Sequence, residues 1–219
     1  MAEIIVSDEE LKKMPFGENF YQNKLIESGI EPSWICKLPF GPMRMVDRAK
    51  YNFSKGAGKC GKGYLVAEKD ISQNDWYFYS HFLGDPVMPG SLGIDGCFQC
   101  LGLVLIIMGF GGLARALAGS FEYNGQILTE VKKIVYRVEI IRILKNPVPT
   151  IIAEVGLFRE GESEPVYRLK EAKLSFFHEG QLERSPHYRP NWEEIKKRAV
   201  KEIEQSRDYY LKNFGEEGF

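Results

Sequence analysis

Apolar and polar residues alternate along several segments of the chain, with the period of two expected of strands that have one buried face. Four segments are predicted to be strands on this basis: 63–71, 136–143, 151–158 and 166–177. Residues 160–163, Glu-Gly-Glu-Ser, suit a hairpin turn between the last two strands. The pattern therefore predicts that this pair is antiparallel.

A long stretch between the first and second predicted strands, residues 96–114, carries no charged residue. Its length permits a membrane-spanning helix. Against that interpretation, it contains Gln99 and several glycines, and the Gly-Phe-Gly-Gly run at 109–112 would break its last third. A helix that is apolar on all sides belongs either in lipid or in the middle of a protein core. We favour a core helix over about 92–108, followed by a glycine-rich turn, and expect no membrane span.

The two ends of the chain differ from this middle. Ser7 and Glu10 have the spacing of a capping box, which predicts a short helix that Pro15 ends. A second helix is predicted at 18–27. Near the other end, apolar residues at helical spacing over 191–211 predict an amphipathic surface helix.

Together these elements predict an α+β fold in which an antiparallel sheet surrounds one buried helix. We expect an N-terminal helical appendage at 1–37, a central domain at 38–178 and a C-terminal helical extension at 179–219. The Gly-x-Gly at 109–111 closes a helix instead of opening one, so it does not have the context of a dinucleotide-binding motif.

Composition narrows the class of protein. Of 219 residues, 44% are hydrophobic and 27% are charged, as in an ordinary soluble domain. The formal net charge of −1 gives no sign of a nucleic-acid-binding surface. The first residues lack a basic segment followed by an apolar one, so no secretory signal is predicted and the cytoplasm is the expected location.

The cysteines point to neither disulfides nor a metal. Four cysteines in a chain of this length do not indicate a disulfide scaffold. Cys97 and Cys100 form a Cys-x-x-Cys pair inside the apolar helix, whereas a redox pair normally opens a helix after a strand. A zinc site would need a second such pair, which the sequence lacks. We therefore predict buried, unligated thiols and expect no metal or other cofactor.

The segment most suggestive of chemistry is HFLGDPVMPGSLGID, residues 81–95. His81 lies in a loop rich in glycine and proline that leads into the apolar helix, and an imidazole titrates near neutral pH. The amides of Gly90 and Ser91 begin that helix, where unpaired N–H groups and the helix dipole favour negative charge. Asp95 places an ionisable group one turn into the helix, where a carboxylate is costly unless it is paired or used.

Two interpretations of these residues stay open at this point. They suit proton removal next to a carbonyl: a base takes the proton, backbone N–H groups hold the developing enolate oxygen, and a carboxyl group in apolar surroundings acts as an acid. Alternatively, Asp95 only hydrogen-bonds a loop and His81 only caps a backbone group.

The run HFLGDPVMPGSLGIDGCFQ, residues 81–99, resembles the active-site signature of the 3-hydroxydecanoyl-acyl-carrier-protein dehydratase/isomerase family of bacterial fatty-acid synthesis. The similarity extends to PMRMVDR (42–48), NGQIL (124–128) and KKIVYR (132–137), and covers about two thirds of the chain. The fold of that family is the hot dog, a long central helix wrapped by a curved antiparallel sheet. This agrees with the architecture predicted above.

The resemblance implies a role for each matching position. His81 would be the base at C2 of a 3-hydroxyacyl thioester, and Asp95 the acid that protonates the departing 3-hydroxyl. Gly90 would donate its N–H to the thioester oxygen. The Val87 carbonyl would orient the His81 ring, and Gln99 would hold the carboxyl of Asp95. Family members are homodimers whose sites combine the histidine of one protomer with the acid of the other, so dimerisation would be required for activity.

The same resemblance places Phe82, Met88, Pro89 and Phe98 along an acyl tunnel, although such residues could equally be plain core. Phe98 stands where the family has tryptophan, which implies a tunnel of different width. Aspartate at position 95, in place of the glutamate of the dehydratase-only branch, favours the branch that also shifts the double bond from trans-2 to cis-3.

Acyl carrier protein is the thioester carrier that the resemblance implies. The basic cluster that docks this acidic protein is thinner here, with only Arg142 and Lys145. Coenzyme A, or a carrier domain of a larger synthase, is therefore an alternative. Two other functions stay open: a hot-dog thioesterase, in which a carboxylate activates water and free acid is released, and a non-enzymatic acyl-binding subunit of a synthase complex.

Overall fold

The computed structural model describes residues 3–17, 19–30, 35–182 and 212. Its main element is a seven-stranded antiparallel sheet with the order β1-β2-β3-β5-β6-β7-β4. The strands are β1 (Ile4–Val6), β2 (Arg48–Asn52), β3 (Tyr64–Asp70), β4 (Leu113–Tyr123), β5 (Lys133–Leu144), β6 (Thr150–Arg159) and β7 (Tyr167–Phe177). The α-helices are α1 (Asp8–Lys13), α2 (Phe20–Glu27), α3 (Gly90–Ile107) and α4 (Glu179–Leu182).

The strands predicted from alternation are confirmed. They correspond to β3, β5, β6 and β7, and the last two pair as the antiparallel hairpin that the turn at 160–163 predicts. β5 shows why the pattern was readable. Its inward-facing side chains at 134, 136, 138 and 140 are fully buried, whereas the side chains between them are half-buried or exposed.

The strands β1, β2 and β4 have no counterpart in the predicted pattern. β4 is an edge strand, and most of its residues are exposed. Its apolar residues Leu117 and Phe121 are 52% and 55% exposed, and its pairing with β7 shifts register between Ala116 and Ser120. A strand that buries neither face in its own chain leaves no alternation to detect.

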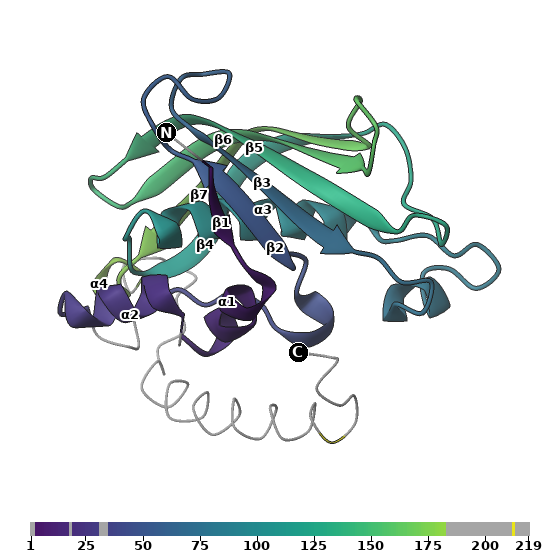
Figure 1. Ribbon diagram of the computed structural model, residues 1–219, viewed down its shortest axis with the longest axis horizontal. Coiled ribbons are helices and arrows are strands. Elements are labelled where there is room, and N and C mark those ends of the chain that lie inside the picture. The colour runs from purple at the N-terminus through teal and green to yellow at the C-terminus, as the bar shows by residue number, and fades with distance from the viewer. Residues whose placement is uncertain (1–2, 18, 31–34, 183–211, 213–219) are drawn as a thin grey trace.

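Helix α3 lies inside the curve of the sheet (Figure 1). Among the described residues it is the one helix long and apolar enough to cross a membrane, and 67% of it is buried inside the protein. Glycines let strand side chains reach its backbone: a Cβ at Gly93 would lie 2.6 Å from the ring of Tyr167, and one at Gly96 would collide with the Tyr136 hydroxyl. This packing supports the core interpretation. A long helix wrapped by a curved antiparallel sheet is the hot-dog fold, and the predicted α+β class is confirmed.

The N-terminal segment contains both predicted helices. The Ser7 side chain accepts a hydrogen bond from the Glu10 N–H and caps α1. A 3-10 turn at Met14–Phe16, which includes Pro15, follows α1. α2 begins later than predicted, at Phe20, because Asn19 and Gln22 form the capping box.

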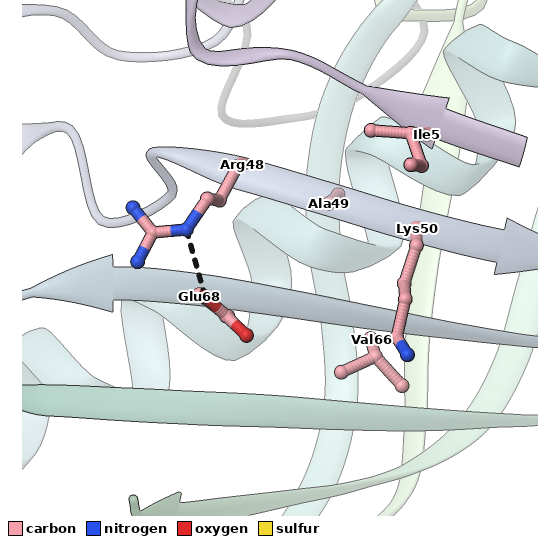
Figure 2. Close-up of a pocket in the computed structure, with 6 residues that line it drawn as sticks. All are labelled: Ile5, Arg48, Ala49, Lys50, Val66 and Glu68. Atoms are coloured by element: carbon pink, nitrogen blue, oxygen red, sulfur yellow. Dashed lines mark hydrogen bonds and ion pairs between the residues drawn. The ribbon is translucent and has the colours of Figure 1, made fainter.

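This N-terminal segment packs on the rest of the molecule. Leu11 and Met14 are buried in the same core as α3, and β1 adds an edge strand next to β2. Figure 2 shows Ile5 of β1 above a small pocket on β2 and β3, about 140 Å³ in volume, where Arg48 contacts Glu68. The helix predicted at 191–211 lies outside the described residues.

Candidate active site

His81 lies in the loop between β3 and α3, directly after a 3-10 turn at Trp76–Tyr79. Its backbone N–H donates to the Tyr77 carbonyl at 2.8 Å, and its carbonyl accepts from the Val87 N–H at 3.0 Å. The ring nitrogen Nδ1 lies 3.1 Å from the Val87 carbonyl oxygen. Because a carbonyl only accepts, this contact requires the proton on Nδ1 and leaves Nε2 with its lone pair. The half-buried imidazole is thereby held in one orientation.

The loop that carries His81 is also held by the segment that follows β4. The Met88 N–H donates to the Ile127 carbonyl at 2.9 Å, and Val87 pairs with Leu128 in an isolated antiparallel bridge. Arg159 of β6 in turn donates to the Gln126 carbonyl. The motif at 124–128 therefore supports the backbone that holds His81.

Helix α3 begins at Gly90 after Pro89, and no side chain caps it. The Gly90 and Ser91 N–H groups therefore start a helix without an intrahelical acceptor, at the positive end of its dipole. A Cβ at Gly90 would lie 2.6 Å from the ring of Tyr123. Glycine at this position lets Tyr123, at the end of β4, pack directly against the helix start.

Asp95 is half-buried one turn into α3 and is held by a network centred on Gln99. Gln99 Nε2 donates to Asp95 Oδ2 at 2.7 Å and to the Met43 carbonyl at 2.8 Å. Gln99 Oε1 accepts from the Met45 N–H at 2.9 Å. This amide is 6% exposed and uses both donors and its acceptor. A side chain bonded in three directions fixes the carboxyl that it holds.

Between the described residues of one chain, no hydrogen bond or ion pair joins His81 to Asp95. His81 is bound by its own loop, whereas Asp95 faces Gln99 and the backbone at 43–45. The two groups are arranged separately by the fold, each with a fixed orientation.

The residues expected along a tunnel lie in different environments. Phe82 is 56% exposed and stacks on His81, with ring centroids 4.0 Å apart. Met88 is buried in the core, while Pro89 and Phe98 are half-buried.

Tyr123 is a candidate wall of the site that the sequence did not reveal. Its ring lies against Gly90 and makes an edge contact with Tyr167, with centroids 5.0 Å apart. It lies 33 positions beyond Gly90 on an edge strand without alternation. The one sequence feature that could have indicated this contact is Gly90 itself, because a glycine at a helix start allows another group to approach the backbone closely.

Cys97 and Cys100 are free and buried, as predicted. Burial raises the pKa of both thiols far above its ordinary value, so neither is a ready nucleophile. In the described part of the chain, no group of three or more His, Cys, Asp or Glu side chains could hold a metal ion.

The fold and the site define a protein of the hot-dog class, which includes dehydratases and thioesterases. Residues 38–169 match the FabA-like domain family, which is more than half of the chain. The chain therefore belongs to the FabA-like domain family.

Solved structures with this fold resemble the chain at low identity. AziG of S. sahachiroi is 8% identical, with 53% of this chain and 85% of that chain covered and a TM-score of 0.40. A putative thioesterase from Silicibacter sp. TM1040 is 15% identical, with 54% and 75% covered and a TM-score of 0.40. The E. coli PaaI protein of the phenylacetic acid degradation operon is 10% identical, with 52% and 76% covered and a TM-score of 0.39. These similarities are too distant to bear on function.

Proposed function

We propose that the protein dehydrates 3-hydroxyacyl thioesters to trans-2-enoyl thioesters. The observation that carries this proposal is the orientation of His81. The Val87 carbonyl fixes the ring through Nδ1, so that Nε2 is free to accept a proton from carbon. Membership of the FabA-like family and the signature at 81–99 support the same chemistry.

In the proposed reaction, His81 Nε2 takes the proton from C2, and the C–H electron pair becomes the C2–C3 double bond. The C3–O bond breaks, and the oxygen leaves as water after it receives the proton of the Asp95 carboxyl. The proton on His81 then returns to Asp95 before the next turnover. The Gly90 N–H, at the positive end of α3, stabilises charge on the thioester oxygen while C2 is deprotonated.

Gln99 has a positioning role in this scheme, because it holds one oxygen of Asp95 and leaves the other for the substrate. We assign Phe82, Met88, Pro89 and Phe98 to the acyl-chain side of the site. Aspartate at position 95 also favours a second reaction, the shift of the double bond from trans-2 to cis-3.

We further propose that the active form is a homodimer in which His81 of one protomer serves the Asp95 of its partner. Two observations support this arrangement. No direct bond joins the two groups among the described residues of one chain. The edge strand β4 exposes Leu117, Phe121 and Tyr123, and an apolar edge strand is suited to pairing with a second copy.

For the carrier we propose acyl carrier protein, with Arg142 and Lys145 at its docking surface. Both side chains are exposed at the end of β5 and just beyond it. Two cations form a small basic cluster for an acidic partner. Coenzyme A thioesters of the same acids are therefore the necessary comparison substrates.

The first prediction tests the pair itself. Purified protein should convert 3-hydroxyacyl thioesters to 2-enoyl thioesters without added metal or nucleotide, as measured by mass spectrometry with several chain lengths on both carriers. His81→Ala should abolish the product, and Asp95→Asn should lower kcat by about 1000-fold or more, since each removes one proton-transfer group. His178→Ala is the matched control, because His178 is exposed beyond β7, and it should keep full activity.

Three results would overturn this assignment. Release of free thiol from acyl thioesters, without enoyl product, would identify a thioesterase. Full activity in both His81→Ala and Asp95→Asn would exclude the proposed pair. Binding of acyl thioesters without turnover by the unmodified protein would identify an acyl-binding subunit. The position of the double bond in the product separates dehydration alone from dehydration with isomerisation.

A further inference from the structure

The backbone that holds Gln99 lies on both sides of one charged residue. The Met43 carbonyl and the Met45 N–H contact the Gln99 side chain at 2.8 and 2.9 Å, and Arg44 stands between them. Arg44 is not free to move, because its side chain is 14% exposed and both of its terminal nitrogens are used in ion pairs. The two backbone groups that orient Gln99 belong to the residues on either side of Arg44, so a shift of the Arg44 backbone would move them.

One of these ion pairs reaches into the N-terminal segment. Arg44 Nη1 lies 3.0 Å from Asp8 Oδ1, and Asp8 is the first residue of α1. Burial raises the pKa of Asp8, but hydrogen bonds from Lys12 and Arg44 outweigh it and the net shift is downward, so Asp8 is ionised at neutral pH. A guanidinium paired with a carboxylate is held more precisely than one that contacts water.

The other ion pair anchors Arg44 in the body of the domain. Arg44 Nη2 lies 3.1 Å from Asp47 Oδ1, and Asp47 also accepts from Lys69 and from the Asp70 N–H. Asp47 is 7% exposed. The guanidinium therefore bridges a carboxylate that directly precedes β2 and a carboxylate of α1.

We propose that Arg44 is a positioning residue for Asp95, and that α1 contributes to catalysis through Asp8. The order of contacts is Asp8 to Arg44, then the backbone at 43–45 to Gln99, and finally Gln99 to Asp95. This proposal rests on the proposed function, because Asp95 is the acid of that reaction. It gives the segment before residue 38, which lies outside the FabA-like match, a role in orienting the site.

A matched control is available at Glu3, where the N-terminal segment makes a second set of contacts with the sheet. Glu3, beside β1, accepts a hydrogen bond from the Tyr64 hydroxyl at 2.6 Å and pairs with Lys50 at 3.1 Å. These contacts also tie the N-terminus to the sheet, close to the pocket of Figure 2, but none of them touches the backbone at 43–45. Loss of attachment alone would therefore affect Glu3→Gln and Asp8→Asn equally.

The test compares full-length unmodified protein with Asp8→Asn, Arg44→Gln, the double variant and Glu3→Gln. With dehydration of a 3-hydroxyacyl thioester as the readout, kcat should fall about tenfold in Arg44→Gln and about threefold in Asp8→Asn, with KM unchanged, because only the placement of the acid is altered. The double variant should equal Arg44→Gln, since Asp8 acts through Arg44. Glu3→Gln should keep the unmodified kcat.

A second readout needs no turnover. The side-chain amide resonances of Gln99, observed by nuclear magnetic resonance without substrate, should move in Asp8→Asn and Arg44→Gln and stay in place in Glu3→Gln. Resonances that do not move, or that move equally in Glu3→Gln, would overturn the proposal. So would an active protein in which kcat is the same in all variants. If the unmodified protein does not dehydrate its substrates, the proposed function fails, and the Gln99 resonances still decide whether Arg44 and Asp8 position the Gln99 side chain that binds Asp95.

Discussion

The proposed base and the proposed acid of the candidate site are held in different ways. His81 is oriented by Val87, six residues later in the same loop. Asp95 is held by Gln99, one helical turn away, but Gln99 is itself fixed by residues 54 and 56 positions earlier in the chain. The His81 ring is therefore oriented within its own loop, although residues 127 and 128 support that loop. Asp95, in contrast, depends directly on a side chain that a distant segment holds. Changes near the acid should consequently affect both folding and catalysis, and changes near the base mainly catalysis.

Among the variants that test this difference between His81 and Asp95, Gln99→Leu should have the largest effect on stability and activity. It would leave the buried Met45 N–H and the Met43 carbonyl without their side-chain partner and would release Asp95. Unfolding free energy should fall by about 2–4 kcal/mol, because buried polar groups lose their partners. The value of kcat/KM should fall by about 100-fold, because the acid is displaced. Chemical denaturation and steady-state kinetics measure the two losses.

Gln22→Leu is the matched control for that variant. Gln22 is also buried, and its Nε2 donates to the Met14 and Cys36 carbonyls at 2.9 and 2.7 Å. It should lose similar stability but retain kcat/KM at temperatures where it is folded. Equal losses of activity in both variants would contradict the assignment of Gln99 to the acid.

A smaller effect is expected on the side of the base from Gly90→Ala. The added methyl group would press on the Tyr123 ring and displace either the ring or the start of α3. We expect kcat/KM to fall by about tenfold with a loss of about 1 kcal/mol or less in stability, because overpacking at a half-exposed ring is readily relieved. Tyr123→Ala in the same chain should restore part of the activity if the collision is the cause.

Gly102→Ala in the same helix provides the comparison. A Cβ there would meet only Leu38 at 3.9 Å, an ordinary contact. It should leave activity unchanged and raise stability slightly, since alanine favours a helix over glycine. A loss of activity equal to that of Gly90→Ala would show that any change in α3 disturbs the site.

The smallest effect concerns the cysteines. Cys60 is exposed, whereas Cys36, Cys97 and Cys100 are buried, and burial raises the pKa of Cys36 to about 12. A thiol reagent should therefore modify Cys60 alone in the folded protein and leave dehydration unchanged, as mass spectrometry and the enzyme assay can check. Rapid modification of Cys97 would contradict the packed environment of α3 beside Asp95.

Much of the central fold was predictable because burial leaves a mark on the sequence. The strands β3, β5, β6 and β7 bury one face, so their apolar residues alternate. Helix α3 is mostly buried and appears in the sequence as a long apolar run with one charged residue, Asp95. β4 was not predictable in this way because its residues are exposed in the single chain. β1 is a strand of three residues, too short to show a period.

The sequence by itself determined the candidate chemistry: a histidine before a glycine at a helix start, and an aspartate one turn further on, are fixed by order along the chain. It also determined that α3 is apolar enough to form a core. Only the tertiary structure decided what holds Gln99, because the Met43 carbonyl and the Met45 N–H reach its side chain from a segment 56 and 54 positions earlier in the chain. Such contacts depend on how that segment packs against α3 and the sheet, and residue order alone carries no signature of that packing.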